Sequence, residues 1–251
     1  MTTQEQDEKI GNWLFKRRSF LPLILIGFGG FCYVFLLYCG IVSIHYWWVD
    51  FLFLCVGFIG LGIRIFTVGF TPKGTSGRNT GEGQIAEQLN TTGIYSIMRH
   101  PLYVGNFFMW LAPALLMFAP YHPEFIGFMC IFFFVVYYRF IIFAEENFLE
   151  RKFGQQFLEW KSKTPTYFPK FSLYKKSNLQ FSLKNVLKRE YNSFFSLVFT
   201  MTVLRMVGFL ITQKQFYLDT PWLIIIFVSF FIFITLKMIK KFTKILDVSG
   251  R

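Results

Sequence analysis

The sequence predicts an all-α integral membrane protein with about six transmembrane helices and an amphipathic helix at the membrane surface. Hydrophobic residues make up 54% of the chain, which contains 36 Phe, and the mean hydropathy is +0.44. This composition is far more apolar than that of soluble domains. The apolar residues also form runs of about 20 residues, which is the length that a helix needs to cross a bilayer.

Six apolar runs predict the spans in chain order. They lie near 20–43, 48–70, 101–119, 124–144, 193–212 and 221–239. The first run follows Lys16, Arg17 and Arg18, like the apolar part of a signal peptide, but it is long and has no small-residue cleavage site. We therefore expect a retained anchor. The third and fourth runs are separated by APYHPE, and although Pro113 interrupts the third, they are expected to form a tight helical hairpin.

The distribution of positive charge predicts the topology. Most of the 26 Lys and Arg residues fall in the N-terminal tail, in 71–99, in 145–192 and in the C-terminal tail. The positive-inside rule places these segments, with both termini, in the cytoplasm. The net charge of +12 does not indicate nucleic-acid binding, because the basic residues lie beside spans and not along one solvated face. Anionic lipid headgroups are the expected partners.

Two polar stretches separate the spans. Residues 71–83, TPKGTSGRNTGEG, combine glycines, hydroxyl side chains and the cations Lys73 and Arg78, which suit either a phosphate cradle or an ordinary polar turn. A short helix is expected around 84–89. In 145–170, apolar residues recur at helical spacing between charges, which predicts an amphipathic helix on the membrane surface. The four Cys and three His residues are too scattered to predict a metal site.

An ordered set of motifs spans roughly residues 80–170. It consists of G-x-Y-x-x-x-R-H-P-x-Y-x-G, an apolar hairpin, Glu-Glu, Phe-Gly and Phe-Pro. This order resembles the isoprenylcysteine carboxyl methyltransferase and phospholipid methyltransferase superfamily. The resemblance implies a helical membrane enzyme with a cytoplasmic pocket for S-adenosylmethionine and a lipid acceptor in the bilayer.

The stretch TSGRNT before this motif is most similar to a bacterial branch that methylates the 1-phosphate of lipid A. That similarity implies a protein of the bacterial inner membrane. The resemblance also divides the chain into an N-terminal tail with two spans (1–70), a methyltransferase core (71–170), and a basic connector with two further spans (171–251).

Residues expected to contact the cofactor follow from the resemblance and from the chemistry of S-adenosylmethionine. Its ammonium needs acids, its carboxylate needs donors, and its adenine needs an apolar slot. The two adjacent glutamates suit the ammonium, while His100, Arg99 and the helix start at Pro101 offer donors to the carboxylate. The expected contacts are Glu87, Gln88, Leu89, Asn90, Tyr95, His100, Pro101, Leu102, Tyr103, Glu145 and Glu146.

Methyl transfer from a sulfonium is a direct displacement, so alignment and exclusion of water matter more than a strong base. A phosphate or carboxylate acceptor is already anionic and is oriented by a cation, for which Arg139, Arg78 and Arg99 are the candidates. A phosphatidylethanolamine amine and a prenylcysteine carboxylate are alternative acceptors. RFIIFAEE has fewer arginines before the acidic pair than the carboxyl methyltransferases carry, which disfavours the prenylcysteine.

Two other classes of protein remain open. Membrane sterol reductases have a similar helical scaffold and an RHP-like segment but use NADPH. A non-catalytic membrane protein is the other alternative to a methyltransferase. The same residues also have simpler interpretations. Arg99 and His100 can be interfacial anchors, the glutamate pair can favour a helix start, Arg139 can snorkel, and the tyrosines can form an aromatic belt.

Overall fold

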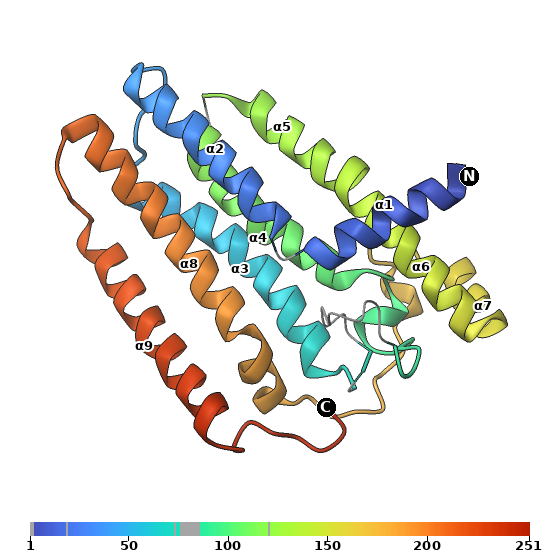
Figure 1. Cartoon of the computed structure of the whole chain (residues 1–251). Coiled ribbons are helices and arrows are strands. Elements are labelled where there is room, and N and C mark those ends of the chain that lie inside the picture. Colours follow the sequence, from blue (N-terminus) through green and yellow to red (C-terminus); the bar gives the residue numbers. More distant parts are fainter. Residues whose placement is uncertain (1–2, 19, 73, 76–85, 120) are drawn as a thin grey trace.

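The computed structural model describes residues 3–18, 20–72, 74–75, 86–119 and 121–251, which form helices and connecting loops (Figure 1). Short 3-10 turns at Ile94–Ser96 and Phe171–Leu173 interrupt the loops. The helices are α1 (Thr3–Arg17), α2 (Leu21–Tyr38), α3 (Trp47–Gly69), α4 (Pro101–Phe118), α5 (Pro123–Ile131), α6 (Arg139–Phe153), α7 (Gln155–Lys163), α8 (Leu183–Gln213) and α9 (Thr220–Phe242).

Among the described residues, five helices are long and apolar enough to cross a membrane, namely α2, α3, α4, α8 and α9. They coincide with five of the six predicted runs, so the all-α membrane class is confirmed. The remaining run, 124–144, which is the fourth in chain order, consists of α5, a π-helical segment Phe132–Tyr138 and the start of α6. This run therefore differs from the single regular span that the sequence suggested.

The third and fourth runs form the expected hairpin, since α5 returns beside α4 (Figure 1). Pro113 lies inside α4 and does not end it. Proline removes one backbone hydrogen bond and often kinks a helix, but packing by neighbouring membrane helices tolerates it.

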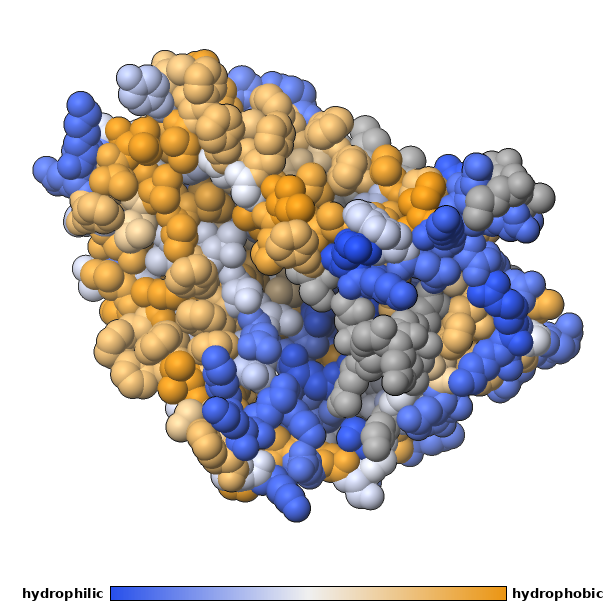
Figure 2. Space-filling model, viewed as in Figure 1, coloured by the Kyte–Doolittle hydropathy of each residue, from blue (hydrophilic) through white to orange (hydrophobic). Residues whose placement is uncertain are grey.

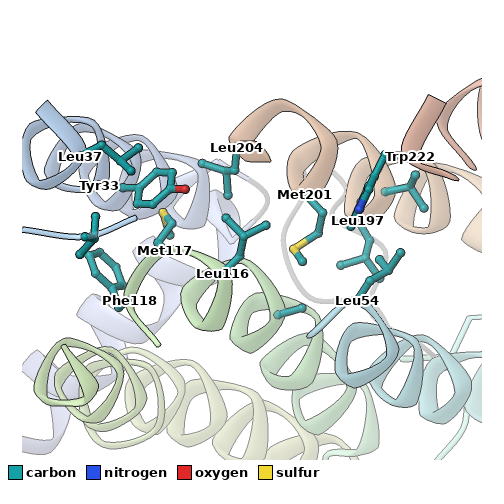
Figure 3. Close-up of a cluster of buried hydrophobic side chains, with 13 residues drawn as sticks. Tyr33, Leu37, Leu54, Leu116, Met117, Phe118, Leu197, Met201, Leu204 and Trp222 are labelled. Carbon is teal, nitrogen blue, oxygen red and sulfur yellow. The ribbon is translucent and has the colours of Figure 1, made fainter. Parts of the chain in front are cut away.

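A cluster of buried apolar side chains packs between the membrane-spanning helices. The cluster joins α2, α3, α4, α8 and α9, and it includes Tyr33, Leu54, Leu116, Met117, Phe118, Leu197, Met201 and Trp222 (Figure 3). Close helix approach depends on glycine here. A Cβ on Gly57 of α3 would lie 3.1 Å from the Ala112 methyl of α4 and 2.7 Å from Leu197 of α8. Small residues let membrane helices pack at short distance.

Polar contacts connect loops at each end of the bundle. At one end, Ser43 Oγ lies 2.6 Å from Tyr121 Oη, and buried Arg205 pairs with Asp50 and Asp219. At the other end, the backbone oxygen of Gly69 accepts from the amide of Ser182 (2.9 Å) and from the Arg251 side chain (2.7 Å). Among the described residues, the 86–99 loop, α7 and the start of α8 lie towards the same end of the bundle (Figure 1), while the cytoplasmic assignment stays a prediction.

Three segments differ from the sequence predictions. The N-terminal tail forms α1, which packs on α6, and Gly11 makes this possible because a Cβ there would lie 2.1 Å from the Phe140 carbonyl oxygen. The predicted amphipathic helix is divided at Gly154, whose φ of +52° separates α6 from α7. Of the short helix expected around 84–89, residues 84–85 lie outside the described part, and residues 86–89 form a bent loop.

Candidate functional site

A cavity of about 650 Å³ lies at the end of the bundle where α4 begins and α8 begins. Its walls come from α2, α3, α4, α8 and the α6–α7 unit, and it is closed by the Tyr95 turn and by Ala86, Gln88, Leu89 and Asn90. On the face shown in Figure 2, hydrophilic residues lie in a recess between apolar surfaces. Of the six apolar residues of α6 and α7 that predicted a membrane-surface helix, Phe148, Leu149, Phe157 and Trp160 line this cavity. Phe153 and Leu158 are absent from the described lining, and Leu158 is exposed.

Glu146 is the centre of a buried ionic cluster. Its side chain is 8% exposed, and its Oε1 accepts hydrogen bonds from Arg99 Nε at 2.8 Å and from His100 Nε2 at 3.0 Å. Lys161 Nζ lies 3.1 Å from the other carboxylate oxygen. A buried carboxylate needs this many partners because water no longer solvates it.

The same contacts control the charge of Glu146. Burial disfavours the ionised form, but the hydrogen bond from His100 and the positive charges of His100, Arg99 and Lys161 outweigh burial and lower its pKa from 4.5 to about 2. Glu146 is therefore a carboxylate at neutral pH.

Arg99 joins the RHP motif to the chain that follows α7. Its Nη1 donates to the carbonyl oxygens of Lys161 at 3.1 Å and Thr164 at 2.5 Å, and its Nη2 donates to Thr166 Oγ1 at 2.7 Å. The amides of Arg99 and His100 also donate to the carbonyls of Pro165 (2.9 Å) and Thr166 (3.2 Å). Arg99 was predicted as a cation for the acceptor, whereas its guanidinium donates to protein groups on both sides.

Glu145 is placed differently from its neighbour. Its side chain is 24% exposed, its Oε2 accepts from Tyr103 Oη at 2.7 Å, and His100 Nδ1 lies 3.8 Å from the same oxygen. The rings of His100 and Tyr103 stack with centroids 5.5 Å apart. Glu145 thus presents a positioned carboxylate to the cavity.

Another part of the cavity wall comes from the Tyr95 turn. Gly93, with φ of +60°, begins this turn, and Trp160 Nε1 of α7 donates to the Tyr95 carbonyl at 3.0 Å. Burial raises the pKa of Tyr95 well above its ordinary value, so its hydroxyl stays protonated. The Tyr95 turn and α7 are therefore fixed to each other beside the cavity.

The structure brings together nearly all residues predicted to contact the cofactor. Glu87 is exposed and is absent from the described lining. The predicted residues that do line the cavity are Gln88, Leu89, Asn90, Tyr95, His100, Pro101, Leu102, Tyr103, Glu145 and Glu146, together with Arg99. Arg139 is exposed and lies outside this lining, and Arg78 lies outside the described residues. The acceptor roles of these two arginines remain predictions.

A second polar cluster was missed by the sequence reasoning. Arg64 of α3 pairs bidentately with Glu190 of α8, with Nε–Oε2 and Nη2–Oε1 distances of 2.8 and 2.9 Å. Arg64 Nη1 also donates to Asn106 Oδ1 of α4 at 2.5 Å. All three residues line the cavity. The available signal was an arginine within an apolar span, which marks a partner or a functional site.

The start of α8 adds a polar strip to this wall. Besides Glu190, the lining includes Arg189, Asn192, Ser193, Ser196 and Thr200. The polar residues of α8 match no sequence motif, so no role was expected for them. Only the packing of α8 beside α3 reveals that they face the cavity.

This fold and cavity define an α-helical membrane protein with a polar site at one end of its bundle. The phospholipid methyltransferase family matches residues 51–156, which run from α3 into α7. The match includes the RHP motif and both central glutamates, and it supports the superfamily that these motifs resemble. Helix α8 lies outside it.

Two curated proteins are similar over 130 residues, or 51% of this chain. They are the nickel-cobalt-cadmium resistance protein NccN of Alcaligenes xylosoxydans xylosoxydans (32% identical) and the cobalt-zinc-cadmium resistance protein CzcN of Cupriavidus metallidurans (34% identical). The matched segment covers 55% and 54% of these relatives, so the chain spans about half of their length. No solved structure matches the chain.

Proposed function

We propose that this protein is an S-adenosylmethionine-dependent methyltransferase that acts on a membrane-embedded lipid. The observation that carries the proposal is the contrast between the two glutamates. Glu146 is enclosed by Arg99, His100 and Lys161, while Glu145 holds a partly exposed carboxylate at the cavity. A positioned carboxylate beside aromatic walls suits a ligand that carries an ammonium and a flat base.

The described residues fit S-adenosylmethionine. Glu145 would bind its ammonium, the Leu102 amide at the start of α4 would face its carboxylate, and Phe148, Phe157 and Trp160 would offer an apolar slot to its adenine. The volume lies within the roughly 300–1,000 Å³ of small-ligand sites. When bound, the cofactor supplies a methyl group on a sulfonium, and the protein aligns an acceptor with it.

A lipid phosphate is the acceptor that we propose, with the 1-phosphate of lipid A as the specific candidate from the TSGRNT similarity. Among described lining residues, four arginines stand against three glutamates. S-adenosylmethionine bound at Glu145 would add the positive charge of its sulfonium to the cavity. This added charge favours an anionic acceptor over an amine. The lipid amine and the prenylcysteine carboxylate remain the alternative acceptors.

The names of the two relatives refer to metal resistance. Within the described residues, no group of three or more His, Cys, Asp or Glu side chains is arranged to hold a metal ion. Metal resistance is therefore not part of the proposed function, which is based on the family match and the cavity. A reductase that uses NADPH remains the rival enzyme class.

Ligand binding by the detergent-purified protein separates these classes. We expect S-adenosylmethionine to bind and NADPH not to bind. Glu145→Gln should weaken S-adenosylmethionine binding about ten- to hundredfold, because a charge-assisted contact contributes roughly 1.5–3 kcal/mol. Glu159→Gln, on the exposed face of α7, is the matched control and should bind normally. Binding of NADPH in place of S-adenosylmethionine would overturn the proposal.

The acceptor is identified by mass spectrometry of lipids from cells that express the wild type or Glu145→Gln. A methyl ester on a lipid phosphate, present only with the wild type, is the expected result. Methylated phosphatidylethanolamine with untouched lipid A phosphate would exclude the phosphate and leave the methyltransferase assignment standing.

A further inference from the structure

The polar cluster on α3, α4 and α8 is separate from the glutamates proposed to serve the cofactor. We propose that it is the subsite for the acceptor's anionic headgroup, with Arg64 as the positioning cation and the polar strip of α8 as the entrance from the bilayer. This inference rests on the proposed function and assigns the second half of the same cavity.

Arg64 is held in one orientation and keeps donor capacity. A guanidinium has five N–H donors, and three of those of Arg64 go to Glu190 and Asn106. Two N–H groups remain without a partner among the described residues, and the residue lines the cavity. Because Glu190 occupies the Nε side, the remaining donors belong to the two Nη nitrogens, which can bind two oxygens of one anion.

Pairing with Glu190 offsets the free-energy cost of burying the Arg64 charge in an apolar span. The glutamate is 4% exposed and gives both oxygens to Arg64, so neither charge is buried alone. Glu190 also fixes the plane of the guanidinium before any ligand arrives. A fixed guanidinium discriminates the shape of a phosphate better than a flexible ammonium does.

The backbone of α4 is shaped to admit Arg64. A Cβ on Gly105 would lie 2.6 Å from Arg64 Cγ and 2.8 Å from the Gly60 carbonyl oxygen. Glycine at 105 therefore lets the side chain of Arg64 cross α4 to reach Asn106, one residue further along. The last glycine of the G-x-Y…RHP-x-Y-x-G motif thus connects the cofactor motif to the Arg64 cluster.

The polar strip of α8 lies where a lipid headgroup would enter. Helices α2 and α8 contact each other near the end of the bundle away from the cavity, where Gly208 packs beside Tyr33. They diverge towards the cavity (Figure 1). The cavity lining includes Leu23 and Ile26 of α2 and Ser193, Ser196 and Thr200 of α8. Ser196 is exposed, although it lies in a helix of membrane-spanning length. A cleft with one apolar and one polar side suits a molecule with acyl chains and a polar headgroup.

Two variants test the subsite by different routes. Arg64→Lys keeps the positive charge but removes the bidentate donation of the guanidinium. Ser196→Phe narrows the proposed entrance to the cavity and leaves the ionic cluster unchanged. The control is Thr235→Phe, an equivalent change on the exposed face of α9 outside the described lining. The probes are a short-chain phosphatidate, its neutral phosphatidylcholine counterpart and S-adenosylmethionine, each titrated into detergent-purified protein.

We expect the wild type to prefer phosphatidate over phosphatidylcholine. Arg64→Lys and Ser196→Phe should each weaken phosphatidate binding about tenfold or more, while the Kd for S-adenosylmethionine changes less than about twofold, which also demonstrates folding. Thr235→Phe should match the wild type. Unchanged phosphatidate binding in both variants, or equal weakening of both ligands, would overturn the subsite. A wild type that binds phosphatidate but not S-adenosylmethionine would instead overturn the proposed function.

Discussion

Glu145 and Glu146 are adjacent in the chain but have different surroundings, because successive residues of a helix point about 100° apart. One carboxylate faces the Arg99, His100 and Lys161 cluster, and the other faces the cavity beside Tyr103. The sequence identified the acidic pair but treated its members alike. Their division follows from the orientation of α6, which α1 packs against.

Acid should remove the stabilising contribution of Glu146. Its pKa is about 2 in the folded protein and about 4.5 without these contacts, so the contribution is present above pH 4.5 and is lost as pH falls towards 2. Glu146→Gln should lower the free energy of unfolding at neutral pH by about 3–5 kcal/mol, because it leaves buried cations poorly paired.

The measurement is denaturant unfolding in detergent between pH 2 and pH 7. The wild type should lose stability through the acid window, and Glu146→Gln should lose distinctly less there. Glu159→Gln, at an exposed site, is the control and should follow the wild type. Parallel pH curves for the wild type and Glu146→Gln would contradict the assignment of Glu146 as the centre of the cluster.

At the scale of elements, hydrophobic periodicity predicted helices well and their surroundings less well. The apolar face in 145–170 was assigned to the membrane surface, and Gly154 divides it. Four of its six apolar residues line the cavity, while Phe153 and Leu158 do not. A helical stripe shows which side chains share a face. It does not show whether that face meets lipid, protein or a ligand.

Helix α4 offers a test of close packing. Gly105→Ala should destabilise the protein and displace Arg64, because the added Cβ would meet Arg64 Cγ at 2.6 Å and the Gly60 carbonyl oxygen at 2.8 Å. We expect a loss of about 1–3 kcal/mol, as for other overpacked sites, with weaker phosphatidate binding.

Gly62→Ala is the matched control, because no atom lies within 4 Å of a Cβ at that position of α3. Alanine there should be neutral or slightly stabilising through its higher helix propensity. Thermal unfolding and phosphatidate titration provide the two readouts. Equal behaviour of the two alanine variants would rule out a close α3–α4 contact at Gly105.

At the scale of the molecule, one cavity draws on all three predicted regions of the chain. Arg18 and Leu23 come from the first region, His100 and Glu145 from the second, and Glu190 from the third. The division at 1–70, 71–170 and 171–251 therefore follows the chain but does not separate the site.

Reporter fusions test the membrane topology. Fusions at Tyr121 and Lys214 should both report the non-cytoplasmic side, because both positions lie in loops at the bundle end opposite the cavity. A fusion after Arg251 should report the cytoplasm, in agreement with the positive-inside rule. A cytoplasmic signal from either loop would disprove the six-span arrangement, including the passage through α5, the π-helical segment and α6.

The resemblance to the methyltransferase superfamily grouped the RHP motif with the acidic pair, and the sequence by itself determined the membrane class and five of the helical spans. These features are local, since composition, periodicity and a short motif encode them. Tertiary structure alone decided that Arg64 meets Glu190, 126 residues away, and that α8 closes the cavity. It also placed Arg139 outside the described lining. Such contacts depend on how helices rotate and pack, and no spacing along one chain specifies that geometry.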